Sequence, residues 1–207
     1  MQTIDYFRGL ESTEKALRGD AYEGLAGIYQ ASKLTHITIA DIRIPATDIA
    51  SPLTFHLEAC KHWHVFCLHT IGITPDSPQD IDNLDDLKKA ILLDERCGQL
   101  GGYLVFLTDA KAFIKRTHAA IRKLGFASRS NLVSYYDDLL FHGFFDDDDV
   151  PFRKARRFAY QKEFRIVAKT PKGVASPLVV DIGDISGIAT LTTPEKFAES
   201  VTVTEDK

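Results

Sequence analysis

The residues best suited to catalysis or ligand binding lie near the C-terminal end of the chain, where Gln161 and Glu163 are followed by Arg165. Side chains two positions apart on a strand lie on one face, about 6.6 Å apart along it, so Gln161 and Glu163 can contact one ligand. Arg165 shares this face, and an ion pair between Glu163 and Arg165 is the alternative that needs no ligand. The pattern therefore predicts either a catalytic site at Glu163 and Gln161 or a structural ion pair.

A basic and aromatic run, residues 152–165, surrounds this pattern. Cationic side chains neutralise phosphates and aromatic rings stack on bases, so the run is also a candidate surface for nucleic acid. The residues expected to contact nucleic acid or phosphate are Arg153, Lys154, Arg156, Arg157 and Arg165. The competing interpretation is a solvated basic surface that pairs with the four aspartates of residues 146–149.

Other candidate sites receive less support from the sequence. The motifs of P-loop hydrolases, dinucleotide dehydrogenases, serine hydrolases and HExxH zinc enzymes are missing. His62, His64 and His69 have no carboxylate at a known ligand spacing, so hydrogen-bonded or solvated histidines are expected there. The consecutive aspartates 146–149 lack the spacing of a calcium loop, and the 3 cysteines have no CxxC spacing. No metal site is predicted.

Composition sets the outer limits. The chain has 207 residues and a formal charge of −4, from 25 Lys+Arg and 29 Asp+Glu, so it lacks the overall positive field of non-specific nucleic-acid binders. It contains no apolar run of the roughly 18 residues that a membrane helix requires, and its N-terminus is not that of a signal peptide. These features predict a cytoplasmic protein without a membrane partner.

The elements that must position these residues follow from periodicity and capping. Strands are expected at residues 4–10, 34–44, 62–70, 103–107, 132–136, 163–168, 177–182 and 187–191. Helices are expected at residues 13–18, 84–96, 110–124 and from 194 onward, with Asn83, Asp109 and Thr193 as N-caps of the last three. Asp20 and Glu23 are expected in a solvated turn. The order predicts a single α+β domain over residues 1–207, with an antiparallel-rich and possibly split sheet flanked by two main helices.

Three parts of the sequence resemble a bacterial and phage family of unknown function. Members of that family carry a C-terminal aromatic-(Glu/Gln)-x-Glu-aromatic-Arg motif. The parts that carry the resemblance are Arg18 with Asp20, Glu23 and Gly24, the segment 65–68, and the segments 152–154 and 160–165. This resemblance implies a family and no activity.

A second resemblance implies a mechanism. An Arg-Gly at residues 8–9, a middle strand that ends in a hydroxyl residue and a late Gln-x-Glu are similar, in their order, to the motifs of ADP-ribosyltransferases of the arginine-serine-glutamate type. The resemblance implies that Arg8 binds the phosphate or ribose of NAD through its planar fork of donors. Thr70 would support the nicotinamide ribose. Residues 68–70 depart from the Ser-Thr-Ser motif of that family, and His69 would substitute by stacking or hydrogen bonding.

In the same resemblance, Glu163 would bind the ribose 2′-hydroxyl and stabilise the oxocarbenium charge. Gln161 would face the acceptor, where an amide argues against an arginine acceptor. The implied function is NAD-dependent ADP-ribosyl transfer or NAD hydrolysis by a bacterial or phage toxin or defence effector. NAD is then the cofactor, and the partners are a protein or nucleic-acid acceptor and an antitoxin or defence complex. The alternative is a non-catalytic nucleic-acid-binding or protein-interaction module that uses residues 152–165.

Overall fold

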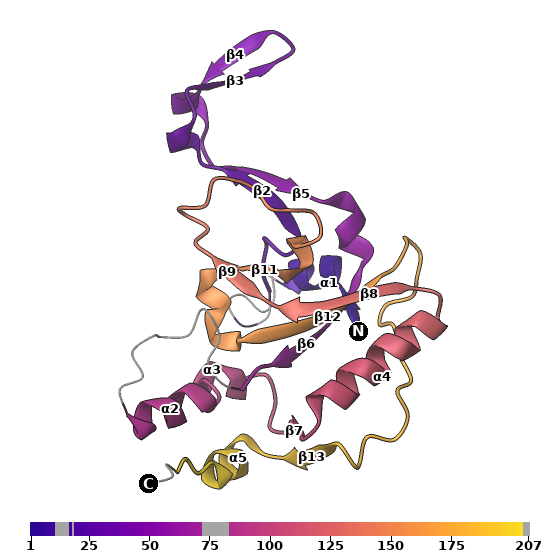
Figure 1. Cartoon of the computed structure of the whole chain (residues 1–207). Coiled ribbons are helices and arrows are strands. Elements are labelled where there is room, and N and C mark those ends of the chain that lie inside the picture. The colour runs from indigo at the N-terminus through magenta and orange to yellow at the C-terminus, as the bar shows by residue number, and fades with distance from the viewer. Residues whose placement is uncertain (11–16, 18, 72–82, 205–207) are drawn as a thin grey trace.

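A four-stranded antiparallel sheet lies at the centre of the computed structural model, which describes residues 1–10, 17, 19–71 and 83–204. Its strands lie in the order β1 (Gln2–Thr3), β6 (His64–His69), β12 (Glu163–Lys169) and β8 (Ala127–Leu132). β12 is hydrogen-bonded on both sides, to β6 and to β8 (Figure 1). The side chains of β12 point alternately to the two faces of the sheet. Because β12 is an inner strand, its side chains are largely buried on both faces.

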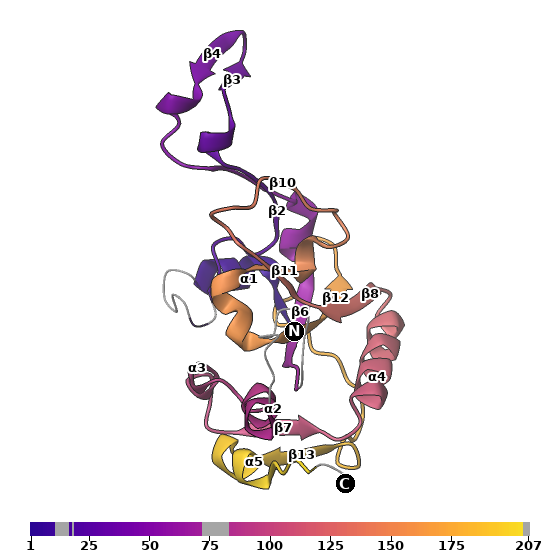
Figure 2. The same cartoon turned by 60° about the vertical axis from the view of Figure 1, so that its left-hand side comes forward.

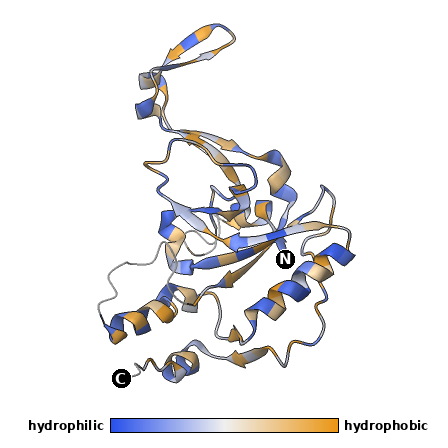
Figure 3. Ribbon diagram, in the orientation of Figure 1, coloured by the Kyte–Doolittle hydropathy of each residue, from blue (hydrophilic) through white to orange (hydrophobic). Residues whose placement is uncertain are grey.

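Helix α4 (Ala110–Lys123) covers one face of the central sheet. The Asp109 carboxylate accepts a hydrogen bond from Ala112 N–H and so caps the helix. Phe113 and Ile121 on its apolar side pack with Ile166 of β12, while its basic residues face outward, so polar and apolar residues alternate along this helix (Figure 3). This amphipathic helix is the one that the sequence pattern predicts.

The opposite face of the sheet packs against the short helix α1 (Ile4–Gly9), which Thr3 caps by accepting a hydrogen bond from Tyr6 N–H. Ile4 of α1 is completely buried with Val65 of β6 and Val167 of β12. Glu163 and Arg165 precede Val167 on this same face, because their side chains alternate with those of Phe164 and Ile166. The site described below therefore lies on this face, at the N-terminal end of β12 and next to the apolar core.

Smaller sheets and helices surround this centre. The sheets are β10 (Gly143–Phe144), β2 (Leu25–Tyr29) and β5 (Leu53–His56) in that order, the parallel pair β11 (Arg153–Ala155) and β9 (Ser134–Tyr136), the pair β13 (Ala189–Thr192) and β7 (Leu104–Leu107), and the hairpin β3 (His36–Ile39) and β4 (Ile42–Pro45). The remaining α-helices of the described chain are α2 (Leu84–Ile91), α3 (Glu95–Gly98) and α5 (Pro194–Ser200). The β3–β4 hairpin extends away from the body of the molecule in both views (Figures 1 and 2).

The predicted α+β class with an antiparallel-rich, split sheet is confirmed. Asn83, Asp109 and Thr193 cap their helices as expected, each accepting a backbone N–H bond. The strand expected at residues 34–44 is a hairpin, since Ala40 and Asp41 adopt positive φ angles of 46° and 67° and reverse the chain. The helix expected at 13–18 falls outside the described residues.

Three of the predicted elements are wrong. Residues 4–9 form a helix, because Thr3 caps a turn in which Ile4 points into the core. The helix expected at 84–96 is two helices, because Leu92 is extended and Asp94 caps a new turn at Arg96. Residues 177–182 alternate as a strand does, and the partly buried Leu178, Val180 and Ile182 pack against the apolar cluster between α4 and β12, but the segment pairs with no strand of the described chain. Leu178 exchanges two backbone hydrogen bonds with Met1, each at 2.8 Å, so this single pairing and side-chain packing together explain their alternation.

Candidate active site: a buried ion cluster beside two cavities

The N-terminal end of β12 places two charged residues in the protein interior. Glu163 is 6% exposed and Arg165 is 2% exposed. In the antiparallel register Glu163 lies opposite His69 and Arg165 lies opposite Cys67, both on β6. The Arg165 Nε donates to Glu163 Oε2 at 2.7 Å. The ion pair that the two-residue spacing allowed is therefore present.

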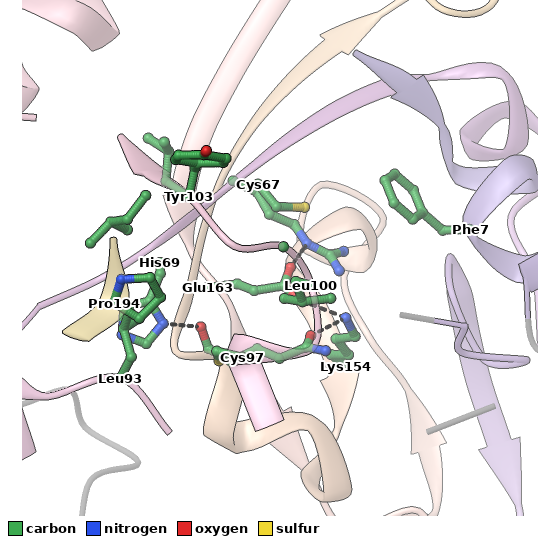
Figure 4. Close-up of a pocket in the computed structure, with 15 residues that line it drawn as sticks. Phe7, Cys67, His69, Leu93, Cys97, Leu100, Tyr103, Lys154, Glu163 and Pro194 are labelled. Carbon is green, nitrogen blue, oxygen red and sulfur yellow. Dashed lines mark hydrogen bonds and ion pairs between the residues drawn. The ribbon is translucent and has the colours of Figure 1, made fainter. Parts of the chain in front are cut away.

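Lys154 on β11 supplies a second cation to Glu163. Its ammonium group donates to Glu163 Oε1 at 2.5 Å and to Gln161 Oε1 at 2.6 Å, and it lies 4.8 Å from the centroid of the Phe158 ring. Lys154 is buried, so these partners replace the water that its charge would otherwise need. Glu163 thus has one cation on each carboxylate oxygen (Figure 4).

Glu23 closes the arrangement on the far side of Arg165. Both oxygens of the Glu23 carboxylate accept from the Arg165 guanidinium in a bidentate pair, and Arg165 Nη1 also donates to the Pro151 carbonyl at 2.8 Å. Glu23 is 1% exposed. We call Glu23, Lys154, Glu163 and Arg165 the ion cluster. Its two anions and two cations compensate each other, which is the condition for keeping charges in a protein interior.

Titration behaviour is consistent with this compensation. Burial alone would raise the pKa of Glu163, but the charges and hydrogen bonds of Arg165 and Lys154 outweigh it and lower that pKa well below its usual range. Burial would lower the pKa of Lys154, but the negative charges of Glu163 and Glu23 together contribute to raising it above its usual value. The two partners agree in direction, so Glu163 remains an anion and Lys154 remains a cation at neutral pH.

Asp20 lies next to the cluster and behaves differently. Burial and the nearby Glu23 charge raise the pKa of Asp20 to about 6. Asp20 Oδ1 accepts from Tyr22 N–H at 3.0 Å and from Arg157 at 3.3 Å, whereas Oδ2 has no hydrogen-bond partner among the described residues. The solvated turn expected for Asp20 and Glu23 is thus wrong, since both carboxylates are buried and pair with arginines. Gly24 turns the chain at this point with a φ of +71°.

A cavity of about 310 Å³ opens beside the cluster (Figure 4). Its polar side is formed by Lys154, Gln161, Glu163, Arg165 and His69. The rest of its lining comes from Phe7, Cys67, Leu68, Leu93, Cys97, Leu100, Gly101, Tyr103, Leu104 and Pro194. Few polar groups that converge in a mostly apolar pocket are typical of small-molecule sites. We call this space the first cavity.

A second cavity of about 420 Å³ adjoins the first, since Leu68, His69, Leu93 and Leu104 line both. His69 Nδ1 lies 2.9 Å from the carbonyl oxygen of Gln161 and donates to it, because a carbonyl only accepts. Burial lowers the pKa of His69, so the ring is neutral at pH 7 and its Nε2 is an acceptor. This Nε2 and the Thr70 hydroxyl are buried and lack partners among the described residues.

The structure brings together only part of the residues predicted from the sequence. Glu163, Gln161 and His69 line the first cavity, and Thr70 lines the second. Gln161 reaches the cavity by an unexpected route: it ends a 3₁₀-helix at Arg156–Gln161, and Lys162 adopts φ 42° before the strand begins. Its amide is held by Lys154, by the Leu17 carbonyl at 2.7 Å and by Tyr160.

Arg8, the residue expected to bind NAD phosphate, does not line either cavity. Its Nε and Nη2 donate to the Glu23 carbonyl at 3.1 and 2.8 Å, so its planar fork of donors holds protein backbone. Arg8 lies behind Glu23, which in turn binds Arg165. This position makes Arg8 a support for the ion cluster and not a ligand-binding residue of the cavity.

The basic run is also divided by the fold. Lys154 and Arg165 are interior residues with paired charges, so they are not available as surface contacts for phosphate. Arg153 pairs with Asp149 at 2.9 Å, and Arg157 pairs with Asp138 at 2.8 Å. Arg156 is exposed. The residues Arg129 and Lys169 neutralise Asp148, so the acidic run pairs with its own basic neighbours.

Sequence reasoning missed three contributors to the site. Lys154 was expected to bind phosphate and is the partner of Glu163. Glu23 was expected in a solvated turn and instead binds Arg165 in the interior. Tyr103, 77% exposed and at the rim of the first cavity, carries no sequence signal of its own.

Comparison of the chain with protein-family models, curated proteins and solved structures gives no match. Within the described residues, no group of three His, Cys, Asp or Glu side chains is placed to hold a metal ion. None of the helices in this part of the chain combines the length and apolar character needed to cross a bilayer. Inference about function therefore depends on the cavities and the ion cluster.

Proposed function

We propose that the chain binds NAD, with the nicotinamide ribose in the first cavity, and cleaves the nicotinamide bond as an ADP-ribosyltransferase or NAD hydrolase. The observation that carries this proposal is an ionised carboxylate, Glu163, fixed at the wall of a mostly apolar cavity. A preorganised anion of this kind can stabilise the positive charge that develops on the ribose when its bond to nicotinamide breaks.

Glu163 retains the capacity to bind a ligand despite its two cations. A carboxylate offers about four acceptor positions, and the protein uses one on each oxygen. A ribose hydroxyl can therefore still donate to Glu163. Lys154 and Arg165 fix the direction of the carboxylate, and in this proposal they act as positioning residues.

The remaining predicted residues take revised roles. The Gln161 amide is fully engaged by protein groups, so Gln161 positions Lys154 and does not face an acceptor. Among the described residues, His69 Nε2 and the Thr70 hydroxyl have no hydrogen-bond partner, and buried polar atoms without partners are rare in proteins. His69 lines both cavities and Thr70 lines the second, so in this proposal they shape the space around the ligand.

Titration calorimetry with NAD and chromatographic measurement of released nicotinamide test this proposal. We expect binding, a ligand-dependent rise in melting temperature, and a loss of nicotinamide release of about 100-fold in Glu163→Gln. Glu163→Gln also disturbs the ion cluster, so a second variant, Leu100→Trp, fills the first cavity from its rim without touching a charge.

Leu139→Trp is the matched control, because Leu139 is 80% exposed and lies outside both cavities. Leu100→Trp should weaken NAD binding at least tenfold, and Leu139→Trp should leave it unchanged. If the wild-type chain neither binds NAD nor releases nicotinamide, the proposed function is wrong.

A further inference from the structure

A groove lies between strand β8 and helix α4, away from the ion cluster. β8 is the outer strand of the central sheet at the end opposite β1, and α4 lies beside it in both views (Figures 1 and 2). The groove has a volume of about 550 Å³ and is lined by Lys115, His118, Ala119 and Arg122 of α4 and by Ser128, Arg129 and Ser130 of β8. None of these residues lines either cavity described above, so the groove is a separate candidate site.

The outer edge of β8 presents backbone donors and acceptors. Val133, directly after β8, donates its N–H to the Glu163 carbonyl at 2.8 Å, and bonds of β8 to β12 recur at every second residue from this point. The N–H and C=O groups of Ser128 and Ser130 therefore point away from β12. Within the described part of the chain, β8 pairs with no strand on that side. An edge of this kind can bind an extended peptide as an additional strand.

The histidine of the groove fixes α4 against β8. His118 Nδ1 lies 2.6 Å from Ser128 Oγ, and His118 Nε2 lies 3.0 Å from Ser130 Oγ. The groove is therefore preformed, which lowers the entropic cost of binding. The two contacts also show that Ser128 and Ser130 direct their side chains to the α4 side of the sheet. Every second side chain of an added strand would point to this same side, into the groove.

The α4 wall of the groove carries positive charge. Lys115 and Arg122 are both exposed and lie two turns apart, about 10 Å along the helix axis. Neither has an ion-pair partner among the described residues, whereas Arg129 pairs with Asp148. Alternate side chains of a strand lie about 6.6 Å apart, so two carboxylates at such positions can each reach one of these long, flexible cations.

The edge and the cations together favour a peptide over a nucleic acid. A phosphate backbone would neutralise Lys115 and Arg122, but it offers only acceptors. The edge of β8 offers N–H donors and C=O acceptors at the same residues, and another peptide backbone satisfies both.

We propose that the groove between α4 and β8 binds an extended acidic segment of a partner protein. The segment adds a strand to the outer edge of β8 and places carboxylates at alternate positions against Lys115 and Arg122. This interaction does not depend on the proposed NAD activity, because the groove and the two cavities have no lining residue in common within the described chain.

The probe is a capped, fluorescein-labelled hexapeptide of sequence Thr-Glu-Val-Glu-Val-Thr, and its matched control has lysine in place of both glutamates. Fluorescence anisotropy with the full chain should show binding of the glutamate peptide that is at least about tenfold tighter than that of the lysine peptide. The affinity should fall as salt is added, since exposed charges are screened. Absence of binding, or equal affinity for the two peptides, would overturn the proposal.

A pair of charge reversals on α4 tests the location. Lys115→Glu should weaken binding of the glutamate peptide at least about tenfold, because it replaces an attractive charge in the groove by a repulsive one. Lys123→Glu is the matched control: it changes the net charge equally, at an exposed position of the same helix that is not among the lining residues. Equal losses in the two variants would show that the peptide responds to overall charge and would overturn the assignment to the groove.

Methylation of the peptide backbone separates strand addition from simple attraction of charge, and it leaves the protein unaltered. One peptide carries methyl groups on both glutamate nitrogens and the other on both valine nitrogens. Only one alternating set of N–H groups faces β8 in an added strand, so one of the two peptides should lose binding at least about tenfold and the other should retain it. Equal affinities would overturn strand addition. A short oligothymidine that binds more tightly than the glutamate peptide, and is lost in Lys115→Glu, would instead assign the groove to nucleic acid.

Discussion

Replacing Lys154 by methionine should destabilise the protein far more than the same replacement at Lys169. Lys154 is buried and bonds Glu163 and Gln161, whereas Lys169 is one-third exposed and pairs with an Asp148 that is 65% exposed. Methionine keeps the approximate length and volume of lysine but removes the charge. The comparison therefore isolates the contribution of the buried cation.

The expected magnitudes follow from burial. Removing one partner of a buried ion pair costs about 3–5 kcal/mol, because the other charge stays in the interior without compensation. An exposed ion pair contributes about 0–1 kcal/mol, since water screens it. Lys154→Met should thus lower the free energy of unfolding by at least about 2 kcal/mol more than Lys169→Met does. Urea unfolding at pH 7, followed by circular dichroism, measures both.

A double-mutant cycle attributes the loss to the pair. If Lys154 and Glu163 stabilise each other, Lys154→Met combined with Glu163→Gln should cost at least about 1 kcal/mol less than the sum of the single variants. Additive losses, or a Lys154→Met variant as stable as Lys169→Met, would refute the compensation argument.

Acid adds an independent check. Because the pKa of Glu163 is lowered on folding, its ionisation contributes stability that is present above its unfolded value near 4.5 and is lost as the pH falls toward the folded value. Loss of Lys154 removes much of this contribution. The difference in stability between the wild type and Lys154→Met should therefore be smaller at pH 3 than at pH 7.

Two further predictions concern the turn that carries Asp20 and Glu23. The pKa of Asp20 is raised from 3.8 to about 6, so its ionisation destabilises the folded state as the pH rises through this range. At about 1.4 kcal/mol per pKa unit, the loss of stability reaches about 3 kcal/mol. In urea unfolding, Asp20→Asn should consequently gain stability relative to the wild type as the pH rises from 4 to 7. If the difference in unfolding free energy between the two proteins does not depend on pH, Asp20 is not buried as described. Gly24→Ala should destabilise more than Gly183→Ala by about 1–3 kcal/mol: both glycines have positive φ, but a Cβ at Gly24 lies 2.7 Å from Ile4 Cγ2 and one at Gly183 meets nothing within 4 Å. Equal melting temperatures for the two variants would contradict the close approach of this turn to α1.

The sequence predicts well where local rules decide the structure. Helix caps at Asn83, Asp109 and Thr193 and the alternation of β12 were found because each depends on residues within a few positions of one another. The shared face of Glu163 and Arg165 follows from the same period of two. Thr3 shows the limit: its cap converts an aromatic segment that resembles a strand into helix α1.

The site itself depends on contacts that no local pattern contains. Glu23 and Arg165 are 142 positions apart in the chain, and Lys154 reaches Glu163 from a different strand. Lys154 lies in a basic and aromatic run whose composition is typical of a protein surface. Only the parallel pairing of β11 with β9 places Lys154 inside the protein. Charge compensation across such distances is a property of the assembled fold.

The ion cluster also affects how the chain folds. Its members come from three segments, around residue 23, residue 154 and residues 163–165, which must all be present before any charge is balanced. A partly folded state that lacks one segment keeps an uncompensated charge away from water and is disfavoured. The cluster thus couples the N-terminal turn to the C-terminal strands in one cooperative unit, and amide protons of both parts should exchange with solvent through the same opening event.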